Sequence, residues 1–364
     1  MEPLDPAVLL AQVGALGADL RTLTEPVAQQ IDGLLDPGPW ASIDKVYLIG
    51  DGDSYHACHA AQWAFESIAG IACEAHSAQR FLSYGPTRSA RGLGGRVLVI
   101  GTSASGSTER VAQALAHART LGAITLALTG RPASPVTHAA EHSLVIELTD
   151  SRPSPGIRTY QASLLGMLLT AIHLSGAHPQ SQESSPAPEK LREEIVGLAT
   201  PVDATADEAG HRCPEIVEQI VATPVMMMIG SGPSHGTAMF AAAKVIEACG
   251  VFATGQDLEE WSHVERFAHP LDMPVFVIAP PGRTHQRATE VAEQARSLGR
   301  RVIAVTHQDD TTLTTHAHTV LPVLGRTREE FSPLLYHPFA AHLACCLAQQ
   351  LDRHPFQADL NARR

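Results

Sequence analysis

Residues 101–108 read Gly-Thr-Ser-Ala-Ser-Gly-Ser-Thr, and the rest of the chain is interpreted from this stretch. An apolar run, residues 96–100, precedes it, and an alanine-rich segment with helical spacing, residues 109–120, follows it. The pattern predicts a strand, a tight polar loop and a helix. Hydroxyl groups crowd the start of that helix, at Ser103, Ser105, Ser107 and Thr108. The first N–H groups of a helix lack partners, so such a loop can hold a phosphate; simple helix capping is the alternative.

The composition limits the classes of protein that need to be considered. The chain has 364 residues, which suggests about two domains. Its net charge of -12 argues against general binding to nucleic acid or to an anionic membrane, although a local loop can still bind phosphate. No apolar run has the length of a membrane span, and the first five residues do not resemble a signal peptide. The six cysteines form no CxxC pair, which predicts reduced thiols in a cytoplasmic protein.

Strands and helices alternate in a similar order along both halves of the chain. Predicted strands begin near residues 46, 97, 124 and 144, which are 51, 27 and 20 residues apart. They begin again near residues 225, 275, 302 and 319, which are 50, 27 and 17 residues apart. Two similar arrays indicate duplicated α/β domains with parallel sheets. Ligands of such sheets bind at the carboxyl ends of the strands, where the loops at residues 50–54, 101–108 and 230–234 would lie.

The segments around these strands carry further expectations. Residues 73–77 could form another short strand, and Met226–Met228 are expected to be a buried strand. Residues 180–188 are rich in Ser and Pro and suggest a linker. A connecting helical region is expected over residues 190–223, broken near Pro201 and Pro214 because proline interrupts a helix.

Several segments together resemble the sugar isomerase (SIS) domain family. Residues 52–57, Gly-Asp-Ser-Tyr-His-Ala, resemble its first glycine–serine loop, and residues 103–108 resemble its phosphate loop, usually Ser-x-Ser-Gly-x-Thr. Residues 158–160, Arg-Thr-Tyr, stand where related isomerases and deglycases often carry Lys-Thr-Tyr. The second half adds Gly-Ser-Gly-Pro-Ser at residues 230–234. Lys-Val-Ile-Glu at residues 244–247 and His263 then follow at the interval of the isomerase half of glucosamine-6-phosphate synthase.

The resemblance implies two tandem SIS domains of the α/β class. Each is expected to be a three-layer α/β/α (flavodoxin-like) sandwich around a parallel five-stranded sheet. We expect a helical segment over residues 1–37, the first domain over 38–180, a linker over 181–210, and the second domain with a C-terminal tail over 211–364. The implied ligand is a small phosphosugar or amino sugar phosphate. No metal or organic cofactor, nucleic acid or membrane partner is expected, and the family pattern implies a homodimer.

The resemblance also assigns roles to residues. The expected substrate- and phosphate-binding residues are Gly52, Asp53, Ser54, Ser103, Ser105, Gly106, Thr108, Arg158 and Ser231. Glu247 would move a proton between C1 and C2 of an open-chain sugar, because one base must serve both carbons. Lys244 lies three residues earlier on the same helical face and would hold Glu247 ionised or stabilise an enediolate oxygen. His263 would help to open the sugar ring from a neighbouring subunit, with Glu260 as a candidate to orient it.

Plainer interpretations stay open beside these. Lys244 and Glu247 could form an ordinary surface ion pair, which contributes little to stability. His263 could be a solvated or core histidine. The glycines of residues 230–236 partly resemble a dinucleotide fingerprint, although the third comes one residue late.

The sequence also departs from the family pattern. Ala104 replaces the usual glutamine of the phosphate loop, and Asp53 replaces the usual threonine of the first loop, with Asp51 nearby. Val264-Glu265 replaces the usual Gly-Pro after the histidine. The sequence ends at residues 361–364, where the family often has a longer tail with a catalytic lysine. Arg363 is a candidate to substitute for that lysine, but arginine stays protonated and cannot accept a proton. These changes point to an altered substrate or reaction.

Two functions of different classes follow. The first is an enzyme acting at C1 and C2 of a phosphorylated sugar or amino sugar, as an isomerase, a deaminase or a deglycase. The acidic residues of the first loop mildly favour a substrate with a cationic amine. The chain has no room for a preceding glutaminase domain, so a glutamine-dependent synthase is not expected unless ammonia or a partner protein is supplied, as in an aminotransferase-type isomerase without that domain. The second function is that of a non-catalytic protein that senses a sugar phosphate. Regulators with SIS domains usually carry a DNA-binding helix-turn-helix, which is not expected here.

Overall fold

The computed structural model describes residues 4–85, 96–149, 152, 154–177 and 186–357. By their contacts the residues group into two compact units. The first unit consists of residues 18–150 and 158–197, and the second of residues 1–17, 151–157 and 198–364. Arg363 lies outside the described residues. The domain boundaries expected from the sequence remain a prediction.

The first unit contains a five-stranded parallel sheet in the order β2-β1-β3-β4-β5. Its strands are β1 (Lys45–Gly50), β2 (Ala72–Ser77), β3 (Val97–Ser103), β4 (Ile124–Thr129) and β5 (His142–Val145). All seven residues of β3 are buried, as expected for a central strand with helices on both faces. The sheet thus confirms the parallel α/β fold expected for the first half.

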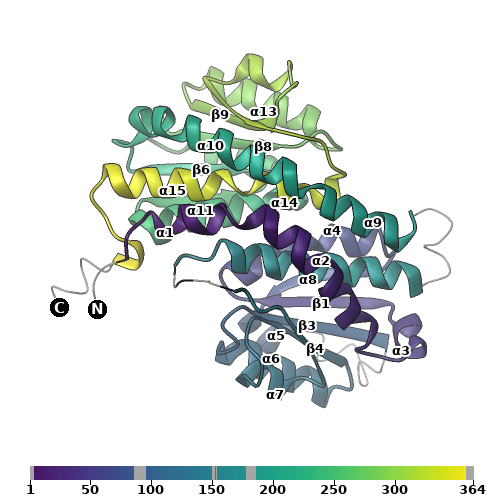
Figure 1. The fold of residues 1–364 in the computed structure, drawn as a ribbon. Coiled ribbons are helices and arrows are strands. Elements are labelled where there is room, and N and C mark those ends of the chain that lie inside the picture. Colours follow the sequence, from purple (N-terminus) through teal and green to yellow (C-terminus); the bar gives the residue numbers. More distant parts are fainter. Residues whose placement is uncertain (1–3, 86–95, 150–151, 153, 178–185, 358–364) are drawn as a thin grey trace. The chain divides into compact units, whose positions relative to one another are not determined.

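Helices cover both faces of this sheet. They are most of α2 (Leu16–Asp32), α3 (Pro37–Ser42), α4 (Asp53–Ser67), α5 (Ala78–Tyr84), α6 (Glu109–Thr120), α7 (Pro135–Ala139), α8 (Arg158–Ala177) and α9 (Pro188–Gly197). Helices α4 and α8 lie on one face, and α5, α6 and α7 lie on the other (Figure 1). Ile49 and Val99 of the sheet pack there against Phe81, Val111 and Leu115 of the helices. Burial of this apolar surface is the main force that fixes the loops at the sheet edge.

The second unit repeats this arrangement with a sheet in the order β10-β9-β8-β6-β7. Its strands are β6 (Val225–Ile229), β7 (Phe252–Gln256), β8 (Pro274–Ala279), β9 (Arg301–His307) and β10 (Thr319–Val323). Its α-helices are α1 (Val8–Val13), α10 (Ala199–Ile220), α11 (Pro233–Cys249), α12 (Leu258–His263), α13 (His285–Ser297), α14 (Ser332–Tyr336) and α15 (Phe339–Gln350). Short 3-10 helices are η2 (Glu265–Phe267), η3 (Leu313–His316), η4 (Glu329–Phe331) and η5 (Pro355–Gln357).

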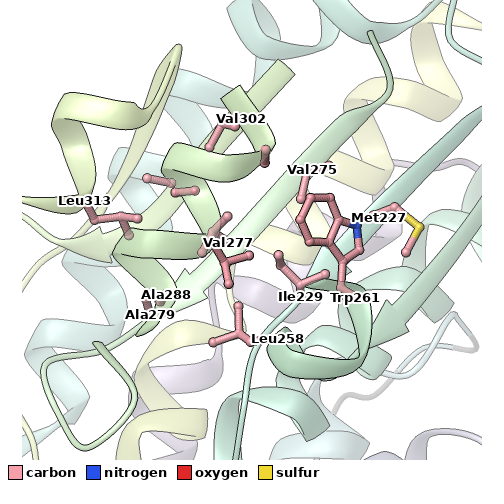
Figure 2. Close-up of a cluster of buried hydrophobic side chains, with 14 of the residues drawn as sticks. Met227, Ile229, Leu258, Trp261, Val275, Val277, Ala279, Ala288, Val302 and Leu313 are labelled. Carbon is pink, nitrogen blue, oxygen red and sulfur yellow. The ribbon is translucent and has the colours of Figure 1, made fainter. Parts of the chain in front are cut away.

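One face of the second sheet is covered by α12 and α13. Figure 2 shows side chains of the strands, among them Ile229 and Val277, packed with Leu258 and Trp261 of α12. Trp261 is fully buried, so the short helix that carries His263 is anchored to the core. None of the helices in the described part of the chain combines the length and the apolar character needed to cross a membrane.

The structure confirms the duplication and corrects some details. The unexpected strand β7 takes the place in the second sheet that β2 takes in the first. The last strand of the first half is β5, which begins two residues earlier than the expected start at Leu144. Pro214 does not break a helix as expected but lies inside α10. An interior proline costs about 3 kcal/mol, and the buried face of α10, with Cys213 and Ile216, offsets that loss by packing.

Candidate functional site

The first strand of each unit ends in the same kind of glycine loop. After β1, Gly52 precedes α4 with φ 56° and ψ −130°. After β6, Gly232 precedes α11 with φ 57° and ψ −131°. A side chain would strain this backbone, which explains why glycine stands at both positions. The loops place Ser54 and Ser234, both buried, in the first turn of the following helices.

The phosphate loop joins β3 to α6 and has its own internal hydrogen bonds. The hydroxyls of Ser103 and Thr108 lie 2.7 Å apart, and those of Ser105 and Ser107 lie 2.9 Å apart. Gly106 has φ 69°, and its N–H donates to the Ser103 carbonyl at 3.0 Å. Thr108 is the residue before α6, so the hydroxyls lie beside the N-terminal N–H groups of that helix. This arrangement offers a donor-rich, positively polarised site for an oxyanion.

The first loop and the phosphate loop lie at the same edge of the sheet. Strands β1 and β3 are parallel neighbours, with Ile49 paired to Gly101. Their carboxyl ends therefore emerge side by side, and each is followed by a helix N-terminus. The structure thus brings together Gly52, Asp53 and Ser54 with Ser103, Ser105, Gly106 and Thr108, as the sequence predicts for a ligand at the strand ends.

Two carboxylates at this edge have partners within the first unit. Asp51 accepts a hydrogen bond from the N–H of Ala78 at 3.2 Å, at the start of α5. Asp53 Oδ1 lies 3.6 Å from Nδ1 of His56. A helix N-terminus stabilises a carboxylate such as Asp51, which lessens its repulsion of a nearby phosphate.

Arg158 lies at the start of α8 and is buried. Its Nε and Nη2 donate to the two carboxylate oxygens of Asp19, both at 2.7 Å, and its Nη1 donates to the Thr149 carbonyl at 2.8 Å. This is a bidentate ion pair between residues 139 positions apart. The role of Arg158 in binding substrate stays a prediction. The sequence analysis missed Asp19, for which no local motif gave a signal.

In the second unit Lys244 and Glu247 form a close pair on α11. Lys244 Nζ donates to Glu247 Oε2 at 2.6 Å, and it also lies 5.1 Å from the centre of the Phe240 ring. The Lys244 side chain is fully buried, whereas that of Glu247 is 30% exposed. An ordinary surface pair would expose the lysine, so the plain interpretation of this pair is wrong. A buried ammonium needs a compensating carboxylate, and Glu247 supplies it while remaining open to solvent or a ligand.

His263 ends α12 and has a largely exposed side chain. Its Nε2 lies 3.0 Å from Oε1 of Glu259, which also binds Arg287 at 2.7 Å through its other oxygen. Hydrogen bonding from Arg287, and then from His263, lowers the pKa of Glu259. The expectation that Glu260 orients His263 is therefore wrong, because the i, i+4 neighbour on the helix is Glu259.

Ser231 lies in the loop between β6 and α11. Its hydroxyl donates to Asp257 Oδ2 at 2.5 Å, and Asp257 caps α12 through the N–H of Glu259. Ser231 therefore links the glycine loop to the short helix that carries His263. Ser231, Lys244, Glu247 and His263 all belong to the second unit, and the phosphate loop belongs to the first. Ser231 stands just before α11, whereas Lys244 and Glu247 lie in its last two turns, about 20 Å further along the helix axis.

Comparisons with known proteins agree with this geometry. A family model for the SIS domain matches residues 41–172 and 223–332. The glutamine–fructose-6-phosphate aminotransferase (isomerizing) of Gloeobacter violaceus is 30% identical over 304 residues, which are 81% of this chain and 47% of that protein. The corresponding protein of Methanothermobacter thermautotrophicus is 28% identical over 299 residues, with the same two shares. The chain thus spans about half the length of these curated relatives.

Solved structures with low sequence identity share the fold. The C-terminal domain of glucosamine-fructose-6-phosphate aminotransferase from Francisella tularensis has a TM-score of 0.80 at 15% identity, covering 95% of this chain and 96% of that one. A glucosamine-6-phosphate deaminase from Thermotoga maritima has a TM-score of 0.71 at 18% identity, covering 95% and 94%. A structure described as a putative phosphosugar isomerase from Silicibacter pomeroyi has a TM-score of 0.75 at 20% identity, covering 94% and 98%.

Proposed function

Because this chain belongs to the SIS domain family, we propose that it is an enzyme that transfers a proton between C1 and C2 of a phosphorylated sugar or amino sugar. The observation that carries the proposal is the pair on α11, in which a fully buried Lys244 holds the partly exposed Glu247 at 2.6 Å. A buried lysine is costly, and its retention beside a carboxylate is typical of a functional site.

The phosphate group of the substrate would bind at the loop of residues 103–108. Hydroxyl donors and the N-terminus of α6 converge there, and Ser54 adds a further hydroxyl at the same sheet edge. Binding at the phosphate would hold the sugar in place, so that its reacting carbons meet one base repeatedly.

Glu247 would act as that base. Its carboxylate removes the proton from the carbon next to the carbonyl, which leaves an enediolate, and returns the proton to the neighbouring carbon. The hydroxyl proton moves from one oxygen to the other, so the isomerisation has no net loss or gain of atoms. The Lys244 ammonium, 2.6 Å from Oε2 of Glu247, pairs with that carboxylate and holds it in position.

For an amino sugar the same proton transfer produces an imine at C2. Water then adds to that carbon and ammonia leaves, which gives the ketose phosphate. Asp51 and Asp53, at the edge of the first sheet, favour a substrate with a cationic amine. The solved neighbour described as a glucosamine-6-phosphate deaminase supports this choice of substrate class.

Proton exchange tests the proposal. The protein is incubated in deuterated water with fructose 6-phosphate, glucose 6-phosphate and glucosamine 6-phosphate, and deuterium at C1 and C2 is followed by NMR. We expect uptake with at least one sugar and a loss of about 100-fold or more in Glu247→Gln, since general-base catalysis contributes on that order. Glu218→Gln, an exposed carboxylate on α10, is the matched control and should retain full exchange.

The other outcomes separate the alternatives. Thermal stabilisation by one sugar phosphate without any exchange would contradict the enzyme proposal and support a sensor; one solved neighbour is described as a putative sugar binding protein. Exchange that survives in Glu247→Gln would show that another group is the base.

A further inference from the structure

The two units contain equivalent loops after their third strands in chain order. Ile49 pairs with Gly101 in the first sheet, and Ile229 pairs with Val277 in the second. Both isoleucines lie three residues before the glycine that precedes the next helix, Gly52 or Gly232. Gly101 and Val277 are therefore equivalent, and the phosphate loop, residues 103–108, corresponds to residues 279–284.

The second loop reads Ala-Pro-Pro-Gly-Arg-Thr. It keeps the glycine, Gly282, and the threonine before the helix, Thr284, which precedes α13 as Thr108 precedes α6. The three serines are lost, and Arg283 stands in place of Ser107. The carboxylate of Glu329 accepts a hydrogen bond from the N–H of Arg283 at 3.5 Å. A carboxylate of the protein therefore occupies the position beside this loop where a bound phosphate would otherwise be expected.

A hollow of about 90 Å³ lies next to this loop at the carboxyl edge of the second sheet. Its lining residues are Pro280, Pro281, Gly325, Arg326, Thr327 and Tyr336. The prolines follow β8 and residues 325–327 follow β10, on either side of the end of β9. One water molecule needs about 10–15 Å³ of such space, so the hollow has room for a group of several heavy atoms.

Tyr336 lines the hollow and carries an unused hydrogen-bond donor. The residue is 2% exposed, and its hydroxyl is buried with no hydrogen-bond partner among the residues that the structure describes. Burial, followed by the charge of Asp310, raises the pKa of Tyr336, so the hydroxyl stays protonated. A buried hydroxyl without a partner is unfavourable, and an acceptor placed beside it would relieve that cost.

The carboxylates near the hollow already have partners of their own. The Asp310 carboxylate is already bound by Nε2 of His285 at 2.8 Å and by the hydroxyl of Thr306 at 2.7 Å, and its other oxygen by the N–H and hydroxyl of Thr312 and the N–H of Leu313. Arg326 has a largely exposed side chain, with Nη2 3.5 Å from Asp309. Tyr336 and Arg326 bring donors to the hollow, and the described residues that line it include no carboxylate.

We propose that the hollow bordered by Pro280, Arg326 and Tyr336 is a second oxyanion site, which binds a phosphate group free or carried by a small metabolite. It is distinct from the loop of residues 103–108 and belongs to the other unit. Arg326 supplies the charge, the Tyr336 hydroxyl donates a hydrogen bond, and Pro280 and Pro281 give the ligand an apolar wall. The proposal depends on the geometry of the second unit alone, so it does not require the reaction proposed above.

Calorimetric titration in a background with a weakened phosphate loop tests this site. Inorganic phosphate, fructose 6-phosphate and unphosphorylated fructose are titrated into Ser103→Ala/Ser105→Ala protein. We expect phosphate binding to remain and to weaken about tenfold in Tyr336→Phe and in Arg326→Gln, since each removes a donor to a charged group. Arg301→Gln, at the amino end of β9 in the same sheet, loses equal charge and should leave the affinity unchanged.

Each outcome decides the proposal. If inorganic phosphate and fructose 6-phosphate both bind, and both variants weaken that binding, the site recognises the phosphate group itself. If only fructose 6-phosphate binds, the site requires a phosphate group that is attached to a metabolite. If Tyr336→Phe and Arg326→Gln bind phosphate as tightly as the Ser103→Ala/Ser105→Ala background does, the proposal is overturned. Binding of unphosphorylated fructose with the same affinity as fructose 6-phosphate also overturns it. A tungstate soak gives a second measurement: an anomalous peak beside the Tyr336 hydroxyl supports the site, and a peak only at residues 103–108 contradicts it. Neither result depends on the Glu247 exchange assay.

Discussion

At the scale of single residues, the buried cations of the two units have different surroundings. Arg158 is bound on both sides of its guanidinium by Asp19 and the Thr149 carbonyl, all within the first unit. Lys244 has a carboxylate partner that is still partly exposed. A buried cation whose carboxylate partner is also buried has a structural role. Where the carboxylate partner is partly exposed, that carboxylate can also contact a ligand.

We predict that Arg158→Met destabilises the protein by about 3–5 kcal/mol, because it leaves the Asp19 carboxylate buried without its partner. The double variant Asp19→Asn/Arg158→Met should recover a large part of that loss. Urea unfolding followed by circular dichroism measures both. If the double variant recovers stability but loses affinity for sugar phosphate, Arg158 also contacts substrate; a single variant as stable as the wild type would contradict the structural role.

At the scale of elements, the loops after β1, β3 and β6 each contain a glycine with positive φ, a backbone conformation that other residues rarely adopt. Gly106 is the clearest case, because its φ is positive and an added Cβ would lie 2.5 Å from the Cβ of Ser134. Ser134 precedes α7 on the neighbouring loop, and the N–H of Val136 donates to the Gly106 carbonyl at 3.2 Å. The phosphate loop is therefore held in shape by the next loop along the sheet edge.

Gly106→Ala should lower the free energy of unfolding by about 1–3 kcal/mol and weaken phosphate binding, since strain and the clash with Ser134 both displace the loop. Gly197→Ala is the matched control, because Gly197 ends α9 in the same unit and no atom lies within 4 Å of its added Cβ. Urea unfolding and calorimetry measure the two effects. Equal stability and affinity in the two variants would show that the loop is not fixed in this way.

At the scale of the whole molecule, the duplicated units have diverged in the chemistry at their sheet edges. The first keeps the hydroxyl-rich loop at residues 103–108, and the second keeps the Lys244–Glu247 pair and has an arginine and prolines in the equivalent loop. Duplication gives two copies of the same α/β fold, so a functional loop that is kept in one copy can be replaced in the other. The proposed function assigns phosphate binding to the first unit and proton transfer to the second, and the role of His263 across a dimer interface stays a prediction.

Mixing two inactive variants tests the requirement for a second copy. If His263 acts across a dimer interface, Glu247→Gln and His263→Ala proteins, each nearly inactive alone, should regain up to about a quarter of wild-type turnover when refolded together. Half of the dimers are then mixed, and each mixed dimer has one complete site of two. Analytical ultracentrifugation checks that dimers form. A mixture that stays inactive while dimers exchange would place His263 and Glu247 of one site in the same chain, and full activity of His263→Ala alone would exclude His263 from the reaction.

The sequence alone determined the features that depend on neighbouring residues. Apolar runs followed by glycine and hydroxyl residues predicted the strands, the sheet-edge loops and the duplication, and these follow from short-range backbone preferences. Strand β7 was missed because Phe252–Gln256 contains a glycine and two polar residues and is a strand only beside β6. Pro214 was expected to end a helix, but the buried face of α10 keeps it intact.

Only the tertiary structure decided which side chains meet. Asp19 and Arg158 are far apart in the chain, and their ion pair exists because folding of the first unit brings α2 and α8 together. Glu259 rather than Glu260 reaches His263, because α12 is a regular helix anchored by Trp261. The buried state of Lys244 and the unpartnered hydroxyl of Tyr336 depend on packing of α11 and α14. Local backbone structure depends on residues that are adjacent in the sequence. Burial and long-range contacts form only when the chain folds and packs its hydrophobic cores.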